Sequence, residues 1–281
     1  MILIADSGST KTNWALIQNK EVVNIIKTDG INPFFRDLED ISDELEKVLV
    51  PQIYGKVTKV FFYGAGIINN VKGAGVKRLL QDFFPEATIA AYSDLLAAAR
   101  ATLGKQKGIA CILGTGTNSC VYDGEKIIDH VSPLGFILGD EGSGAVMGRK
   151  LLGDYLKKVM PEVLRNKFKA EYNLSGTEIM ERVYRKERAN LFLAGFTKFI
   201  YDNIETEYCT DFVLAEFNAF VDRNLLNYEA VNSYPICFIG SVAFYFQQIL
   251  KEVLNSRSLI CGTIIKDPME GLIHYHKNLG N

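Results

Sequence analysis

The sequence predicts an α/β protein with two similar lobes, the second of which carries a helical insertion. Three observations predict this class. A chain of 281 residues exceeds the usual size of a single core. The order strand, small polar turn, strand, turn, strand occurs twice, at the start of the chain and again from residue 108. Between the two copies, strands alternate with amphipathic helices, which is typical of a largely parallel sheet with helices on its faces.

The composition is that of an ordinary globular protein, with 48% hydrophobic and 23% charged residues. The formal net charge is −2, from 31 basic and 33 acidic residues, so neither nucleic acid nor an anionic membrane is expected as the main partner. The apolar start is about four residues long, too short for a signal peptide or a membrane span. Five cysteines lack CxxC spacing, and Cys111 and Cys120 lie in apparent strands, which favours reduced core thiols and a cytoplasmic protein.

The first dozen residues contain a predicted hairpin. Residues 2–5 are a short apolar run, typical of a buried strand, that ends at Asp6 in a turn of small polar residues. Residues 12–17 resume the extended pattern, and residues 21–28 follow as a third strand after a turn at 19–20. The first turn lacks the GxxxxGK[ST] pattern and leads into a strand, so it is not a P-loop.

This first turn carries groups that suit phosphate. Ser7, Gly8, Ser9 and Thr10 offer closely spaced backbone N–H groups and hydroxyls. The carboxylate of Asp6, at the end of the strand, could hold a hydrated Mg²⁺. Taken alone, the stretch is explained equally well as an ordinary hairpin with a polar tip.

A second copy favours the ligand-binding interpretation. Residues 108–113 are another apolar run, followed by a turn at 114–118 and a return strand at 119–122. After a turn at 123–124, a third strand covers 126–131. Two such hairpins indicate two lobes that face each other across a cleft, each directing a phosphate-binding turn at one ligand.

The rest of the first lobe alternates helices with strands. Helices are predicted over 37–49 and 71–84, and strands over 57–63 and 87–92. In the loop before the first helix, Asn32 could hydrogen-bond a sugar hydroxyl, although an asparagine before proline is more often only a turn residue. The small residues at 64–66 favour close packing.

Ser93 and Asp94 stand between the strand at 87–92 and a helix. Ligands gather at this position in open α/β sheets, which makes Asp94 a candidate catalytic residue. Serine and aspartate are also favoured helix N-caps, so both interpretations stay open. The polar stretch at 104–108 is the predicted hinge between the lobes.

The second lobe contains a glycine-rich acidic loop at 139–144, directly before a predicted helix. Asp140 and Glu141 could simply favour the positive end of that helix. A glycine-flanked acid in this position can also bind sugar hydroxyls, and we assign that role to Asp140 and leave Glu141 structural.

Residues 151–228 are almost wholly helical in pattern, with a capping box at Ser175 and helices predicted over 189–203 and 212–228. A strand at 235–239 ends at Gly240 and Ser241, where a helix that runs to 254 begins, a favourable place for nucleotide contact. A strand at 259–261 and a helix from 268 complete the chain. The two histidines near the end are two residues apart and lack metal-ligand spacing.

Together these pieces resemble the sugar-kinase branch of the actin, hsp70 and hexokinase superfamily. More narrowly, they resemble the N-acetylglucosamine kinases and their relatives in the BadF/BadG/BcrA/BcrD ATPase group. The matching motifs follow the family's order over nearly the whole chain: DSGSTKT at 6–12, DGIN at 29–32, GAG at 64–66, SD at 93–94, LGTGTN at 113–118, GDEGSG at 139–144 and GS at 240–241.

The resemblance implies two lobes of ribonuclease H-like (actin-like ATPase) topology around an interlobe cleft. The first lobe would span residues 1–106 and be joined by a C-terminal helix at 268–281. The second lobe would span residues 107–267 and include the helical insertion.

The resemblance also implies an enzyme that uses ATP and Mg²⁺, with Asp94 as the catalytic base and Asp6 near the metal. The nucleotide and its metal would be bound by Asp6, Gly8, Ser9, Thr10, Thr115, Gly116, Gly240 and Ser241. The sugar pocket would be lined by Asn32, Asp94, Thr117, Asn118, Gly135 and Asp140.

The implied reaction is phosphorylation of a hexosamine, N-acetylglucosamine before others, on its primary hydroxyl. Residues 134–136 replace a GWG-like sugar-contacting segment, which leaves the sugar open, and Lys11 is given no role. Two alternatives stay open: a partner-activating ATPase of the same group, whose members hold an iron–sulfur cluster through cysteines, and a non-catalytic sugar- or nucleotide-binding regulator. The sequence does not decide whether the chain forms a homodimer.

Overall fold

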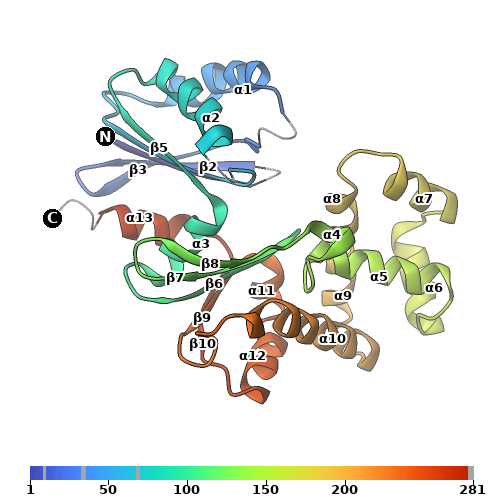
Figure 1. Cartoon of the computed structure of the whole chain (residues 1–281). Helices are drawn as coiled ribbons and strands as arrows, with labels where there is room; N and C mark the ends of the chain where they lie inside the picture. Colours follow the sequence, from blue (N-terminus) through green and yellow to red (C-terminus); the bar gives the residue numbers. More distant parts are fainter. Residues whose placement is uncertain (9–10, 33–35, 68–69, 278–281) are drawn as a thin grey trace. The chain divides into compact units, whose positions relative to one another are not determined.

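The computed structural model describes residues 1–8, 11–32, 36–67 and 70–277 (Figure 1). The chain divides into two compact units. Unit 1 comprises Met1–Lys105 together with Asp267–Asn281, and unit 2 comprises Gln106–Lys266. Each unit is built around a five-stranded sheet of its own.

Unit 1 forms its sheet from the first part of the chain. Its strands are β1 (Ile2–Ser7), β2 (Lys11–Gln18), β3 (Glu21–Asp29), β4 (Lys59–Gly64) and β5 (Thr88–Ser93). Its helices are α1 (Leu38–Glu44), α2 (Asn70–Phe83), α3 (Asp94–Leu103) and, from the end of the chain, α13 (Met269–Lys277). A π-helical turn, η1 (Leu45–Leu49), and a 3₁₀ turn, η2 (Val50–Gln52), extend α1.

The strand order in unit 1 is β3-β2-β1-β4-β5. The first three strands pair antiparallel, whereas β1, β4 and β5 are parallel neighbours. Because side chains alternate along a strand, the two faces of the sheet have separate cores. Helices α1 and α2 cover the face that carries Leu3 and Trp14, and α3 and α13 cover the face that carries Ile4 and Ala15 (Figure 1).

Helix α13 is attached closely to α3. A Cβ atom at Gly271 would lie 2.3 Å from Ala101 O, so only glycine permits this crossing. The Tyr63 hydroxyl accepts a hydrogen bond from Arg100 Nη1 (2.8 Å) and lies 2.8 Å from His276 Nε2. Burial, assisted by the charge of Arg100, lowers the pKa of His276 to about 3, so the ring is neutral in this contact.

In unit 2, most of the helices lie in one insertion, between the third and fourth strands in the sequence. The strands are β6 (Gly108–Leu113), β7 (Thr117–Tyr122), β8 (Ile127–Val131), β9 (Ile236–Ile239) and β10 (Cys261–Ile265). The insertion after β8 holds α4 (Gly135–Leu138), α5 (Gly144–Leu156), α6 (Glu162–Tyr172), α7 (Gly176–Tyr184), α8 (Ala189–Ala194), α9 (Thr197–Asp202), α10 (Glu207–Arg223) and a 3₁₀ turn, η3 (Leu225–Asn227). Helices α11 (Ser241–Tyr245) and α12 (Gln247–Ser256) follow β9.

The two sheets follow the same plan. The strand order in unit 2 is β8-β7-β6-β9-β10, with the same parallel and antiparallel neighbours as in unit 1. Pairing resumes at Thr12 after the first turn and at Thr117 after the second. The second strand of each hairpin then shifts register against the third at the same step, between Leu16 and Ile17 and between Val121 and Tyr122. The predicted fold class, α/β with two similar lobes and a helical insertion in the second, is confirmed.

Several local predictions are wrong. Both sheets are mixed rather than largely parallel, because each contains an antiparallel three-stranded hairpin. The last strand covers Cys261–Ile265 rather than 259–261, since Cys261, Ile264 and Ile265 are the residues that pair with β9. The helices predicted over 189–203 and from Gly240 to 254 are each interrupted, the second at Phe246.

The structure describes neither a membrane-spanning helix nor a disulfide among the residues it covers. No helix among the described residues is long and apolar enough to cross a membrane. All five cysteines are free, and four of them are buried. Burial raises the pKa of Cys111 and of Cys120, so both thiols are protonated core side chains.

Candidate active site

The tip of the β1–β2 hairpin is held by a buried network of hydroxyls. Ser7 Oγ lies 2.8 Å from Thr12 Oγ1 and accepts a hydrogen bond from Ile31 N (2.9 Å). Thr12 Oγ1 in turn donates to Asp29 O (3.0 Å). The network therefore joins the hairpin to the loop after β3, and the motifs predicted at 6–12 and 29–32 form one corner of unit 1.

The structure describes Gly8 and Asn32 among the ligand-binding residues predicted at this corner, but not Ser9 and Thr10. Gly8 is exposed, and its N–H donates to Lys11 O (3.0 Å), so this donor closes the turn itself. Ser9 and Thr10 lie outside the described residues, and their phosphate contacts stay predictions. Asn32 is buried, and its backbone carbonyl accepts a hydrogen bond from Arg36 N (3.1 Å).

The charges of two other carboxylates of unit 1 act on Asp6. Asp6, at the end of β1, lies on the face covered by α3 and α13 and is partly buried. Burial raises the pKa of Asp6 to about 7, the negative charges of Asp267 and Asp94 add to the rise, and Lys11 opposes it. Burial also raises the pKa of Asp94. The structure thus brings the two predicted aspartates together and adds Asp267, which sequence reasoning missed.

Helix α3 distinguishes the roles of Ser93 and Asp94. Ser93 is its N-cap, since Ser93 Oγ accepts a hydrogen bond from Leu96 N (3.2 Å). Asp94 is the first residue of the helix, and its Oδ1 accepts a hydrogen bond from Leu95 N (2.8 Å). Capping therefore falls to the serine, and the aspartate is available for another role.

In unit 2, the turn between β6 and β7 packs on the start of α5. Gly114 O accepts a hydrogen bond from Gly144 N (2.8 Å), and Thr115 O accepts one from Ala145 N (3.0 Å). Gly240 approaches the same turn with φ +124°, and a Cβ there would lie 2.2 Å from the last carbonyl oxygen of β6. Only glycine fits this position. The structure therefore brings the predicted phosphate-binding turn and the predicted adenosine-contacting glycine together.

Asp140 lies against this turn. It is 8% exposed and adopts a left-handed backbone conformation with φ +54°. Its Oδ1 accepts a hydrogen bond from Thr117 N (3.3 Å), and its Oδ2 would lie 3.0 Å from a Cβ at Gly116. Burial raises the pKa of Asp140 to about 6, against the effect of the Thr117 N–H. Thr117 Oγ1 is buried next to the Asp140 carboxylate, whose pKa its hydroxyl helps to lower, and it makes no well-aligned hydrogen bond among the described residues, so a ligand hydroxyl could bind to both groups.

Helix α10 of the insertion braces the loop that carries Asp140. Glu141 forms an ion pair with Arg223 (2.5 Å) and accepts a hydrogen bond from Asn224 Nδ2 (3.3 Å). Gly142, with φ +75°, packs against Phe220. The contacts give Glu141 the structural role expected from the sequence.

The structure also places three further predicted site residues: Asn118, Gly135 and Ser241. Asn118 follows Thr117 on β7, so its side chain points to the opposite face of the sheet, where its Oδ1 lies 2.8 Å from His130 Nε2. Gly135 is the exposed first residue of α4, with open space around its Cβ position. Ser241 is exposed at the start of α11.

A magnesium ion is compatible with the corner of unit 1. The described residues contain no group of three or more His, Cys, Asp or Glu side chains that could hold a metal on their own. Mg²⁺ does not need such a group, because it keeps several waters and binds through one or two carboxylates and substrate phosphates. The carboxylate oxygens of Asp6 suit this mode of binding.

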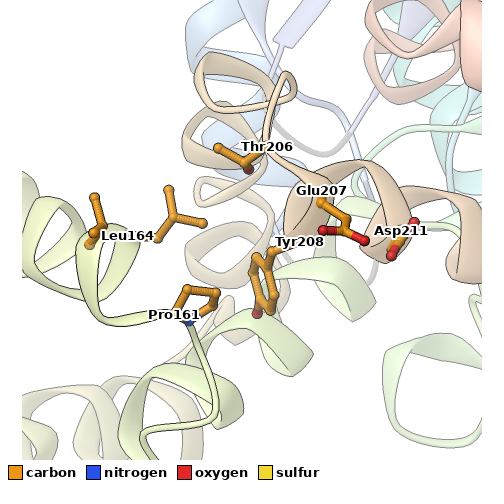
Figure 2. Close-up of a pocket in the computed structure, with 7 residues that line it drawn as sticks. Pro161, Leu164, Thr206, Glu207, Tyr208 and Asp211 are labelled. Carbon is orange, nitrogen blue, oxygen red and sulfur yellow. The ribbon is translucent and has the colours of Figure 1, made fainter.

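Unit 2 also has an open hollow of about 480 Å³ between α6 and the start of α10 (Figure 2). None of the residues that line it is a predicted site residue: Pro161, Val163, Leu164, Thr206, Glu207, Tyr208 and Asp211. Val163 is 82% exposed, and the Tyr208 hydroxyl is used in a hydrogen bond to Asp154 Oδ2 (2.7 Å). The hollow is therefore a surface feature of the insertion.

Two mixed five-stranded sheets of the same order, each with flanking helices, define the two-lobed fold of the actin, hsp70 and hexokinase type. A ROK hexokinase from Thermus thermophilus has this fold, with a TM-score of 0.53 at 13% identity over 98% of this chain and 96% of that chain. A Chromobacterium violaceum protein with the provisional name N-acetylglucosamine kinase matches over 98% of both chains, with a TM-score of 0.73 at 15% identity. No protein-family model and no curated protein matches the chain.

A third solved structure is far more similar. It is that of a Porphyromonas gingivalis protein, also provisionally named N-acetylglucosamine kinase, with 45% identity and a TM-score of 0.94 over 99% of both chains. The present chain therefore belongs to the family of sugar kinases that includes this protein.

Proposed function

We propose that this protein is an ATP- and Mg²⁺-dependent kinase that phosphorylates the primary hydroxyl of a hexosamine, with N-acetylglucosamine as the first candidate. The main support is the pair of partly buried aspartates with raised pKa values at strand ends of unit 1, Asp6 at the end of β1 and Asp94 directly after β5. The provisional name of the P. gingivalis protein supports the choice of sugar.

Phosphoryl transfer requires mainly positioning and charge neutralisation. Asp94 accepts the proton of the attacking hydroxyl while the hydroxyl oxygen bonds to the γ-phosphorus and ADP leaves with the bridging oxygen. The raised pKa of Asp94 suits this role, since a general base works best when its pKa approaches the operating pH. Asp6, together with water, would hold Mg²⁺, whose charge would neutralise that of the phosphates.

Unit 2 contributes binding groups. Thr115 and Gly116 bind phosphate oxygens through the β6–β7 turn, and Gly240 and Ser241 border the adenosine. The Thr117 hydroxyl and the neighbouring buried Asp140 carboxylate bind sugar hydroxyls, with Asn32 and Gly135 as further contacts. Asn118 would first have to leave His130.

Within the sugar kinases, the motifs GTGTN and GDEGSG favour the N-acetylglucosamine kinases related to the BadF/BadG/BcrA/BcrD group. The partner-activating ATPases of that group hold their cluster through cysteines, and burial of four of the five cysteines argues against this function here. A non-catalytic regulator would not need both Asp6 and Asp94.

An ADP-coupled assay with N-acetylglucosamine, glucosamine, glucose, N-acetylmuramic acid and N-acetylmannosamine tests the proposal. We expect ADP to form only with Mg²⁺ and at least one amino sugar. No ADP formation with any of these sugars would refute a hexosamine kinase. Iron and a brown colour in anaerobically purified protein would favour the partner-activating ATPase instead.

A further inference from the structure

Asp267 binds both the start of a helix and a residue of a distant strand. It lies between β10 and α13 and is partly buried. Its Oδ1 accepts a hydrogen bond from Met269 N (3.0 Å), which caps the first turn of α13. Its Oδ2 accepts a hydrogen bond from Asn13 Nδ2 (3.3 Å). One carboxylate therefore ties the start of α13 to strand β2.

Asn13 is the cross-strand partner of Asp6. The β1–β2 register pairs the two residues directly. Paired residues of an antiparallel ladder present their side chains on the same face, with Cβ atoms about 4.5–5.5 Å apart. Asn13 is 7% exposed, so its amide is confined to this place. Asp6, Asn13 and Asp267 consequently form a row on the face covered by α3 and α13.

This row carries negative charge without a matching ion pair. The negative charges of Asp267 and of Asp94 both act on Asp6. In the part of the chain that the structure describes, no salt bridge involves Asp6, Asp94 or Asp267, and only the charge of Lys11 acts on Asp6 in the opposite sense. Partly buried carboxylates that repel one another favour the binding of a cation.

We propose that Asp267 is a positioning residue of the magnesium site, which holds the Asp6 carboxylate in place through Asn13 and strengthens cation binding by its own charge. The proposal rests on the role given to Asp6 in the proposed function. The proposal also explains the position of α13, because the start of this helix brings the Asp267 carboxylate next to β1 and β2.

Two substitutions separate charge from capping. Asp267→Asn removes the charge and keeps an oxygen that can accept the Met269 N–H, whereas Asp267→Ala removes both. Asp123→Asn is the matched control, because Asp123 is a turn aspartate of unit 2 whose Oδ1 accepts hydrogen bonds from Glu125 N (2.9 Å) and Lys126 N (2.8 Å).

The measurement is the affinity of the full-length protein for Mn²⁺ in the presence of ADP, by electron paramagnetic resonance of free Mn²⁺. It is made at about pH 8.5, where Asp6 is ionised in every variant, so that loss of the Asp267 charge cannot act by easing ionisation of Asp6. The Mg²⁺ concentration for half-maximal rate and the KM for the sugar are measured alongside.

We expect the Kd for Mn²⁺ to rise roughly 3- to 10-fold in Asp267→Asn and in Asp267→Ala, and to stay unchanged in Asp123→Asn. The half-maximal Mg²⁺ concentration should rise in parallel, with the sugar KM unchanged. Wild-type Mn²⁺ affinity in Asp267→Asn overturns the proposal. This holds even if Asp267→Ala weakens Mn²⁺ binding, because the weakening would then come from loss of the helix cap and not from loss of the charge. If the wild-type protein binds neither Mn²⁺ nor ADP, the proposed kinase function fails instead.

Discussion

Replacement of Asp94 by asparagine tests the proposed catalytic base with little structural disturbance. Asp94 Oδ1 accepts a hydrogen bond from Leu95 N (2.8 Å), and an amide oxygen can accept the same bond. The cap of α3 is the Ser93 hydroxyl, which the substitution leaves in place. The helix should therefore form unchanged.

The rate and the stability should move in opposite directions. Loss of a general base lowers kcat by roughly 10²- to 10⁴-fold, or about 3–5 kcal/mol. Burial raises the pKa of Asp94, so its ionised form opposes folding at neutral pH. The asparagine variant should be at least as stable as the wild type at about pH 7–8. This advantage should vanish below about pH 3, where the aspartate is protonated in both the folded and the unfolded state.

The assay combines kcat from ADP formation, the Kd for the sugar from titration calorimetry, and the melting temperature at both pH values. We expect the sugar Kd to change by less than about threefold. Ser93→Ala is the control, and should lose about 1 kcal/mol of stability with the cap while keeping kcat. Near-normal turnover in Asp94→Asn, or a loss of turnover that follows a loss of stability, would refute the assignment.

Three further predictions follow from the cited contacts. The kcat/KM for MgATP should fall as the pH drops below about 7, because protonated Asp6 cannot bind Mg²⁺, and a pH–rate profile measures this. Tyr63→Phe should lower the free energy of unfolding by about 2–4 kcal/mol in urea titrations, since Arg100 and His276 each lose a buried hydrogen-bond partner. Gly148→Ala should cost about 2–3 kcal/mol or more in the same assay, because its Cβ would lie 1.8 Å from a backbone oxygen of α8.

Matched variants check these predictions. Gly153→Ala lies on the same helix as Gly148 but has open space around its Cβ, so it should be neutral or stabilising by up to about 1 kcal/mol. Tyr54 is 85% exposed, so Tyr54→Phe should change stability by less than about 0.5 kcal/mol. Equal effects within either pair would contradict the packing described. A flat pH profile between about pH 6 and 8 would contradict the role of Asp6.

The candidate site could be predicted in part because three of its acids stand at recognisable places. Asp6 lies at the end of a strand, Asp94 directly follows one, and Asp140 lies in a glycine-rich loop before a helix. Asp267 carries only the signal of a helix start, an aspartate before proline. Its hydrogen bond joins it to Asn13, which is 254 residues away in the chain, and local patterns hold no information on such a pairing.

Thr117 and Asn118 illustrate a second limit. They are neighbours in one motif, and the resemblance to sugar kinases implies a place in the sugar pocket for both. Strand β7 begins at Thr117 rather than at 119, so the two side chains point to opposite faces. A shift of strand boundary by two residues is within the ordinary error of pattern reading, yet it decides which of the two approaches Asp140.

The sequence by itself determined the elements, the duplicated hairpin, the helical insertion and the resemblance to sugar kinases, because hydrophobic periodicity, turn residues and motifs are properties of short stretches. Only the tertiary structure decided that both sheets are mixed, that Ser93 rather than Asp94 caps α3, and that Asp267 binds the first N–H of α13. It also decided that burial raises the pKa values of Asp6, Asp94 and Asp140. Strand pairing and burial depend on contacts between residues far apart in the chain, and the electrostatics of a carboxylate depends on both.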